Sequence, residues 1–225
     1  GTGMIAEFHA KALAEIPGVK VVAAYNRTPA KAEEFARKFG AVACATPEAL
    51  LAHPDVDVVC LCTPSGDHLA PALACAQAGK HVVVEKPLEV TLARCDALTA
   101  AGAQAGIVLA GILPRRFGAG SQALKAAIVA GRFGQITLAG ALIPWWRTQA
   151  YYDEGGWKGT MALDGGGAFM NQAIHNVDLL LWMMGPVTHV TGFTATLAHE
   201  RIEVEDTGVA CLKFQNGALG VIQAT

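Results

Sequence analysis

Short apolar runs alternate with segments of helical hydrophobic spacing through the first half of the chain. The apolar runs predict β-strands, and the segments between them predict amphipathic helices. The strands are expected at residues 19–25, 57–61, 81–84 and 107–110. The helices are expected at residues 4–14, 28–39, 68–78 and 91–105, with a further short helix that begins at Thr46-Pro47. Because the connections are short, the alternation predicts an α/β fold with a parallel, doubly wound sheet.

The pattern changes after Gly111. A helix at 120–130 and a strand at 135–143 precede a loop at 144–167 that is rich in Trp, Tyr and Gly. A helix at 168–184 follows, and residues 187–197, 207–214 and 218–223 alternate like antiparallel strands, with a hairpin signal at Asn216-Gly217. The sequence therefore predicts two domains: residues 1–111, and an α+β domain at 112–225 with a largely antiparallel open sheet.

Both ends of the sequence resemble cut ends. The chain begins Gly1-Thr2-Gly3 with no strand before the glycines, and residues 217–225 read as an unfinished strand. We therefore expect a piece of a longer protein, without the first strand of the parallel sheet and with an incomplete second domain. A targeting signal before Gly1 stays an open alternative to a cytoplasmic location.

Composition narrows the class of protein. The chain is 52% hydrophobic and 16% charged, which excludes a disordered chain. A net charge of −2 provides no basic excess for nucleic acid or a membrane surface, and no apolar run is long enough to span a bilayer. The six cysteines form no Cys-x-x-Cys pair, so we expect neither a disulfide nor a metal site, and a reducing compartment.

The segment Gly1-Thr2-Gly3-Met4-Ile5-Ala6 matches the pattern G-x-G-x-x-A ahead of a predicted helix. Such glycines let the backbone approach a pyrophosphate at a helix N-terminus, so Gly1, Gly3, Met4 and Ile5 are candidate cofactor residues. A simple glycine-rich turn is the alternative.

Asn26 and Arg27 follow the next strand, where an acidic residue would bind the ribose hydroxyl of NAD. A neutral residue beside an Arg favours the 2′-phosphate of NADP, whereas Arg27 as a solvated cation is the alternative.

Two polar segments follow predicted strands, where ligands bind in open α/β sheets. Thr63, Pro64 and His68 come after one strand, and Glu85 and Lys86 come after the next. Lys86 can stabilise negative charge on a substrate oxygen, and Pro87 allows a cis bond. The alternatives are a surface Lys in a turn and helix capping by His68.

Asn171, His175 and Asp178 share one face of the predicted helix at 168–184. His175 can accept the proton of an alcohol, and Asp178 can orient the imidazole. A buried core histidine is the alternative, but Gly165 to Gly167 just upstream allow another element to approach closely. The preceding loop holds Trp146, Arg147, Tyr152 and Trp157, whose aromatic faces and donors suit a sugar ring. A packed loop or a dimer contact explains it equally well.

Together these motifs resemble those of the Gfo/Idh/MocA oxidoreductases. The resemblance rests on Gly1-x-Gly3-x-x-Ala6, Thr63-Pro64-x-x-x-His68, Glu85-Lys86-Pro87, Arg115-Arg116-Phe117 and the run from Gly165-Gly166-Gly167 through Asn171 and His175 to Asp178. It implies an NAD(P)-binding Rossmann domain followed by a substrate-binding and oligomerisation domain. It also implies that Lys86 contacts both substrate and nicotinamide ribose, that His175 is the acid/base, and that Arg116 lies at the substrate. Inositol dehydrogenase-like members carry Asp at the position of Asn171, which leaves the tuning of His175 open.

The resemblance implies an NAD(P)-dependent oxidoreductase that transfers a hydride between the nicotinamide and a secondary hydroxyl or ketone of a sugar, sugar derivative or cyclitol. The protein is expected to act as a homodimer or homotetramer. A non-catalytic dinucleotide or sugar sensor of the same fold is the alternative, although Lys86 and His175 argue for catalysis. A further alternative is an aldose–aldose oxidoreductase that keeps its cofactor bound.

Overall fold

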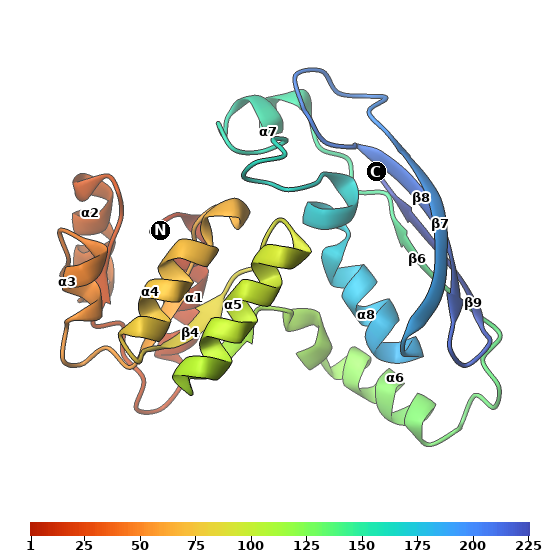
Figure 1. The fold of residues 1–225 in the computed structure, drawn as a ribbon, viewed down its shortest axis with the longest axis horizontal. Helices are drawn as coiled ribbons and strands as arrows, with labels where there is room; N and C mark the ends of the chain where they lie inside the picture. The colour runs from red at the N-terminus through yellow and green to blue at the C-terminus, as the bar shows by residue number, and fades with distance from the viewer. The chain divides into compact units, whose positions relative to one another are not determined.

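Strand and helix alternate through residues 1–112, as the hydrophobic pattern predicts (Figure 1). The computed structural model describes all 225 residues, which divide into two units, Gly1–Ile112 and Leu113–Thr225. The first unit contains α1 (Met4–Ala14), β1 (Ala23–Ala24), α2 (Pro29–Phe39), β2 (Val42–Ala43), α3 (Pro47–Leu51), β3 (Val58–Leu61), the 3₁₀ turn η1 (Ser65–Asp67), α4 (Leu69–Gln77), β4 (His81–Val84), α5 (Leu92–Ala105) and β5 (Leu109–Gly111).

All strand pairs of the first unit are parallel, which confirms that prediction. The strands form two sheets, β1–β2 and β3–β4–β5. Of the strand predicted at 19–25, only Ala23 and Ala24 are assigned to β1. The last residue of β3, Leu61, is opposite the last residue of β4, Val84. The segments that follow these two strands therefore start side by side at one edge of the sheet.

Threonine side chains mark two helix starts in the first unit. The hydroxyls of Thr46 and Thr91 accept hydrogen bonds from Ala49 N and Arg94 N at the first turns of α3 and α5. Thr28 makes no such bond, and α2 begins instead with Pro29, whose fixed φ suits the first helical position. Val82, Val84 and Leu98 are almost fully buried between the sheet and its helices.

The second unit contains the 3₁₀ turn η2 (Pro114–Phe117), α6 (Ala119–Val129), β6 (Leu138–Ile143), α7 (Gln149–Asp153), the π-helical turn η3 (Ala168–Gln172), α8 (Ile174–Met184), β7 (Val187–Ala195), β8 (Thr207–Phe214) and β9 (Leu219–Ala224). The strand order is β6-β9-β8-β7. The two pairings within β7–β8–β9 are antiparallel, and β6–β9 is parallel. The sheet is therefore mixed, with mostly antiparallel pairs as expected, and Asn216-Gly217 forms the turn between β8 and β9.

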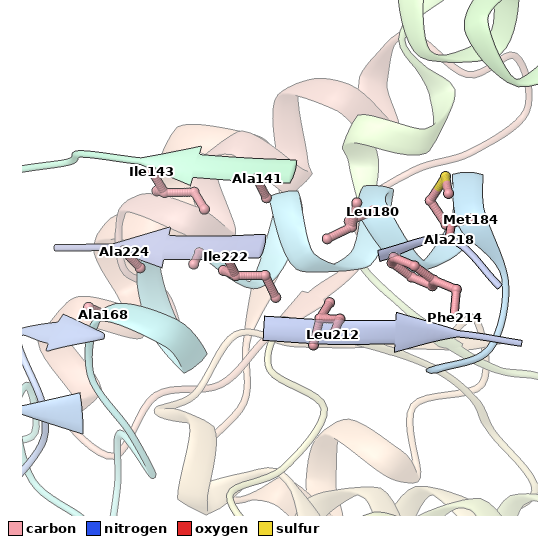
Figure 2. Close-up of a cluster of buried hydrophobic side chains, with 11 residues drawn as sticks. Ala141, Ile143, Ala168, Leu180, Met184, Leu212, Phe214, Ala218, Ile222 and Ala224 are labelled. Atoms are coloured by element: carbon pink, nitrogen blue, oxygen red, sulfur yellow. The ribbon is translucent and has the colours of Figure 1, made fainter. Parts of the chain in front are cut away.

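One face of this sheet packs on α8 (Figure 2). Leu180 and Met184 of α8 belong to the same buried cluster as Leu212, Phe214 and Ile222 of the sheet. Leu212 and Phe214 are two positions apart on their strand, and Leu180 and Met184 are four apart on the helix, so each pair points to the same side of its element. The packing anchors α8, and with it the segment just before α8, to the sheet.

The helix predicted at 168–184 is confirmed from Ile174 to Met184, but its first part is not regular α-helix. The chain forms the π-helical turn η3 first, and regular α-helix begins only at Ile174. The loop predicted at 144–167 also contains the short helix α7. No helix of the chain is sufficiently long and apolar to cross a lipid bilayer. All six cysteines are free thiols.

Candidate functional site

The glycine turn at the start of the first unit fits a pyrophosphate. A Cβ atom on Gly1 would lie 2.4 Å from the carbonyl oxygen of Cys62, so only glycine allows this approach to the end of β3. A Cβ on Gly3 would meet nothing within 4 Å, and no side chain caps α1. The first-turn amides of Met4 and Ile5 are therefore open to an anion, which the partial positive charge at a helix N-terminus favours.

Asn26 joins the glycine turn to the end of β1. Its Nδ2 donates to Thr2 Oγ1 at 2.8 Å, and its Oδ1 accepts from Thr28 N at 2.8 Å. The Arg27 side chain is 79% exposed, and its guanidinium lies 3.8 Å from the Asp67 carboxylate. Asn26 thus shapes the turn, and Arg27 is an exposed cation beside it.

Lys86 follows Glu85 at the end of β4, and the Lys86–Pro87 peptide bond is cis, as the sequence suggested. Glu85 is buried, and Lys86 is half-buried. One Glu85 oxygen lies 2.8 Å from His9 Nε2, and the other accepts from Lys86 N at 3.0 Å. Through these two contacts, Glu85 links the backbone N–H of Lys86 to the side chain of His9.

His68 is a brace between the two polar segments. Its side chain is fully buried. Nε2 lies 3.1 Å from Thr63 O, and Nδ1 lies 3.1 Å from Pro87 O. The side chain does not cap α4, so that interpretation of His68 is wrong. It supports the segments on which Thr63 and Lys86 lie instead of facing solvent.

Glu89 and Arg94 are supporting residues that the sequence analysis missed. The buried Glu89 carboxylate accepts from Leu69 N and Val90 N and pairs with Arg94, whose guanidinium also donates to Gly66 O. Burial alone would raise the pKa of Glu89, but these bonds outweigh it and lower the pKa. The pair therefore ties η1 and Pro64 beside it to the Lys86 segment.

His175 lies in the first turn of α8, directly after η3, and Asn171 lies within η3. Asn171 Nδ2 donates to Asp164 Oδ1 at 2.6 Å, and Asp164 Oδ2 accepts from Gly159 N at 2.9 Å. Asp164 is 1% exposed. A buried carboxylate thus stands beside Asn171, and nothing in the helical spacing pointed to it.

The close approach predicted at the glycine triplet is confirmed. A Cβ on Gly167 would lie only 1.7 Å from Glu205 O. The Glu205 carboxylate accepts from Gly167 N and Phe169 N at the start of η3. The strand connection before β8 therefore presses on the turn that carries Asn171.

Arg116 and Asp178 bind each other. The guanidinium donates from Nε to Asp178 Oδ2 at 2.8 Å and from a terminal nitrogen to Oδ1. Helical spacing predicted that Asp178 lies beside His175, and the family resemblance implied that Arg116 lies at the substrate. The structure gives both side chains a bidentate ion pair that links η2 to α8.

The aromatic loop is built around His199, another residue that the sequence analysis missed. The Trp146 ring stacks on the His199 ring with centroids 4.9 Å apart, and Tyr152 meets it edge-on at the same distance. Trp146 is 59% exposed, whereas Tyr152 is buried, and burial raises the pKa of its hydroxyl. Arg147 donates to Gln172 Oε1 at 2.8 Å, and Trp157 is half-buried. Trp146 and Arg147 are therefore better placed to meet a ligand than Tyr152.

Comparison with known proteins agrees with this geometry. Residues 1–111 match the oxidoreductase family with an NAD-binding Rossmann fold, and residues 121–225 match the GFO/IDH/MocA C-terminal domain. The chain therefore belongs to the Gfo/Idh/MocA family of oxidoreductases.

Several relatives show how far the similarity extends. Myo-inositol 2-dehydrogenase of Thermotoga maritima is 31% identical, over 99% of this chain and 66% of its own length. The 4-carboxy-2-hydroxymuconate-6-semialdehyde dehydrogenase of Sphingobium is 30% identical, over 97% of this chain and 68% of its own length. The crystal structure of the WlbA dehydrogenase of Bordetella pertussis, in complex with NADH and UDP-GlcNAcA, is 41% identical with a TM-score of 0.95. It covers 100% of this chain and 65% of that protein, so the chain spans about two thirds of the length of these relatives.

Proposed function

We propose that the protein is an NAD(P)-dependent dehydrogenase that oxidises a secondary hydroxyl of a sugar derivative, or reduces the corresponding ketone. One observation carries the proposal: the glycine turn and Lys86 meet the same edge of one sheet. Gly1 packs on Cys62 after β3, and Lys86 follows β4, whose last residue pairs with the last residue of β3. Crevices at this edge bind dinucleotides in open α/β sheets.

Each residue has a role that its chemistry supports. The Met4 and Ile5 amides bind the pyrophosphate, with Thr63 and Pro64 lining the rim. Lys86 donates a hydrogen bond to the substrate oxygen and stabilises the negative charge that develops there. His175 accepts the hydroxyl proton through a ring nitrogen, and Asn171, held by Asp164, positions the polar end of α8. When bound, the nicotinamide supplies the hydride acceptor or donor.

The substrate class that we propose is a sugar joined to a nucleoside diphosphate. The 41% identity to a dehydrogenase crystallised with UDP-GlcNAcA exceeds the 31% identity to the inositol dehydrogenase. Trp146 offers an exposed aromatic face, and the next residue, Arg147, is half-buried and carries a guanidinium. An aromatic face and a guanidinium suit a sugar ring that carries anionic groups.

For the cofactor we propose NADP over NAD, because Arg27 is exposed and the end of β1 carries the neutral Asn26. The R27A variant should then weaken NADPH binding about tenfold, which is the cost of losing one charge-assisted contact, and leave NADH binding within about twofold. If NADH binds more tightly to the wild type, the preference for NADP is wrong and the dehydrogenase proposal is unaffected.

The deciding experiment titrates the full-length protein with NADH and NADPH by nicotinamide fluorescence, after a denatured sample has been checked for cofactor already bound. Turnover is then measured on UDP-linked sugars, free sugars and inositols. Dinucleotide binding with turnover of a UDP-linked sugar supports the whole proposal. Turnover of inositols alone overturns the substrate class, and the absence of any dinucleotide binding overturns the dehydrogenase assignment in favour of a sensor.

A further inference from the structure

A buried histidine that belongs to no part of the proposed reaction supports the loop between β6 and α7. His199 lies in the connection between β7 and β8, and its side chain is 5% exposed. We propose that His199 is a positioning residue, which holds Trp146 and Arg147, here called the substrate loop, in the conformation that binds substrate. This inference rests on the proposed function, since it takes the substrate loop to face the substrate.

Asp206 holds the His199 ring from one side. Asp206 Oδ2 lies 3.0 Å from His199 Nδ1 and accepts from the backbone N–H groups of His199 and Ala198. Its Oδ1 accepts from Leu197 N and from the Thr207 hydroxyl. Burial would raise the pKa of Asp206, but these hydrogen bonds lower it strongly. The carboxylate therefore stays ionised and gives the ring a rigid anchor.

The other edge of the ring meets the substrate loop. Nε2 lies 2.7 Å from the carbonyl oxygen of Arg147, 52 residues away in the chain. Because a carbonyl oxygen only accepts, Nε2 is the donor of this hydrogen bond, and the ring is held at both of its edges.

The face of the ring supports the indole of Trp146. The planes of the Trp146 and His199 rings lie 30° apart. The Tyr152 ring also contacts the His199 ring, edge-on, with an interplanar angle of 70°. With one face against His199, Trp146 still has 59% of its surface exposed. The Arg147 guanidinium is held at the same time by Gln172 and lies 5.3 Å from the Tyr151 ring centre. His199 thus fixes the backbone of one proposed substrate residue and the side chain of the other.

Two variants separate the hydrogen bonds from the packing. H199F keeps a ring to pack on Trp146 but has no donor for Arg147 O, whereas the H199Q amide can still donate there. We expect H199F to raise the KM for the sugar substrate about tenfold, with kcat and the KM for the dinucleotide within about twofold, because the loss falls on substrate binding. H199Q should retain a KM closer to the wild type. T207V is the matched control, since it removes a bond to Asp206 without touching the substrate loop.

Hydrogen exchange of the ligand-free protein tests the link without any activity. H199F should speed exchange at residues 145–149 about tenfold relative to the wild type and T207V, while exchange in β8 and β9 shows that H199F is folded. Unchanged exchange overturns the inference. Faster exchange with an unchanged KM also overturns it, because the loop would then be held without serving the substrate. A wild type that binds no dinucleotide instead overturns the proposed function, and exchange alone then decides whether His199 holds the loop.

Discussion

Nε2 of His9 lies 2.8 Å from Oε1 of Glu85, although 76 positions separate the two residues in the chain. His9 belongs to α1, which begins directly after the glycine turn, and Glu85 precedes Lys86. The second Glu85 oxygen accepts from Lys86 N at 3.0 Å. The pair therefore ties the helix that follows the glycine turn to the lysine that we place at the substrate oxygen.

Both members of this pair are charged at neutral pH. Hydrogen bonds with Cys60, Cys62 and Glu85 raise the pKa of His9 to about 12. Burial would raise the pKa of Glu85, but the bonds from His9 and Lys86 N outweigh burial and lower it. With side chains only 13% and 9% exposed, the pair is shielded from solvent.

The H9Q variant should therefore be less stable by about 2 kcal/mol near pH 6, as expected for a hydrogen bond between charged groups. The difference should shrink above about pH 6.5. His9 is then neutral in the unfolded chain and must take up a proton on folding, which reduces the stability gained from the pair. The difference should also shrink below about pH 4.3, as Glu85 becomes protonated first in the unfolded and then in the folded chain. Urea unfolding of the wild type and of H9Q from pH 4 to 9 measures this difference in the free energy of unfolding. A difference that stays constant over this range contradicts the ion pair.

Replacing Lys86 with Ala should lower kcat about a hundredfold or more, because charge on the substrate oxygen loses its donor. The Kd for the dinucleotide should change by less than about fivefold, since the backbone amides at α1 remain. H175A should likewise lower kcat and leave the Kd for the dinucleotide nearly unchanged, because the proton acceptor is lost. The exposed Lys20 of the same unit offers a matched control in K20A, which should leave both constants unchanged. A K86A variant with unchanged kcat would remove Lys86 from the mechanism.

The fold and the Lys86 segment follow from local patterns in the chain. Alternation of apolar runs with helical spacing is enough to predict parallel strands, and strand ends locate Thr63 and Lys86 without any tertiary information. Asp164, Glu89 and His199 could not be found in this way, because each acts through partners that only folding brings close. An isolated acid or histidine in a sequence carries no sign of such partners.

The region around His175 shows the same limit. Regular helical spacing placed Asn171, His175 and Asp178 on one face, but η3 interrupts the helix where Glu205 presses on Gly167. The partner of Asp178 is Arg116, 62 residues away, and that separation gives no local signal. Of the local sequence features, only the three glycines at 165–167 indicated that another segment approaches the start of η3.

The D164N variant tests the buried carboxylate beside Asn171. An amide cannot accept from both Gly159 N and Asn171 Nδ2 as the carboxylate does, so we expect a loss of about 2 kcal/mol in stability and about tenfold in kcat. Dinucleotide binding should be unchanged. D178N is the matched control, because it weakens the ion pair with Arg116 and should cost stability more than kcat. If D178N lowers kcat further than D164N, Asp178 rather than Asp164 supports His175.

Two glycine substitutions should have opposite effects on stability. In G167A the new Cβ would lie 1.7 Å from Glu205 O, a backbone atom that cannot swing aside, so we expect a loss of about 3 kcal/mol. In G120A the Cβ meets nothing within 4 Å inside α6, and a gain of about 0.5 kcal/mol is expected from the lower entropy of the unfolded chain. Urea unfolding measures both. Equal stabilities would mean that the backbone around η3 yields easily, and Asn171 and His175 would then lack the rigid base that a proton-transfer site needs.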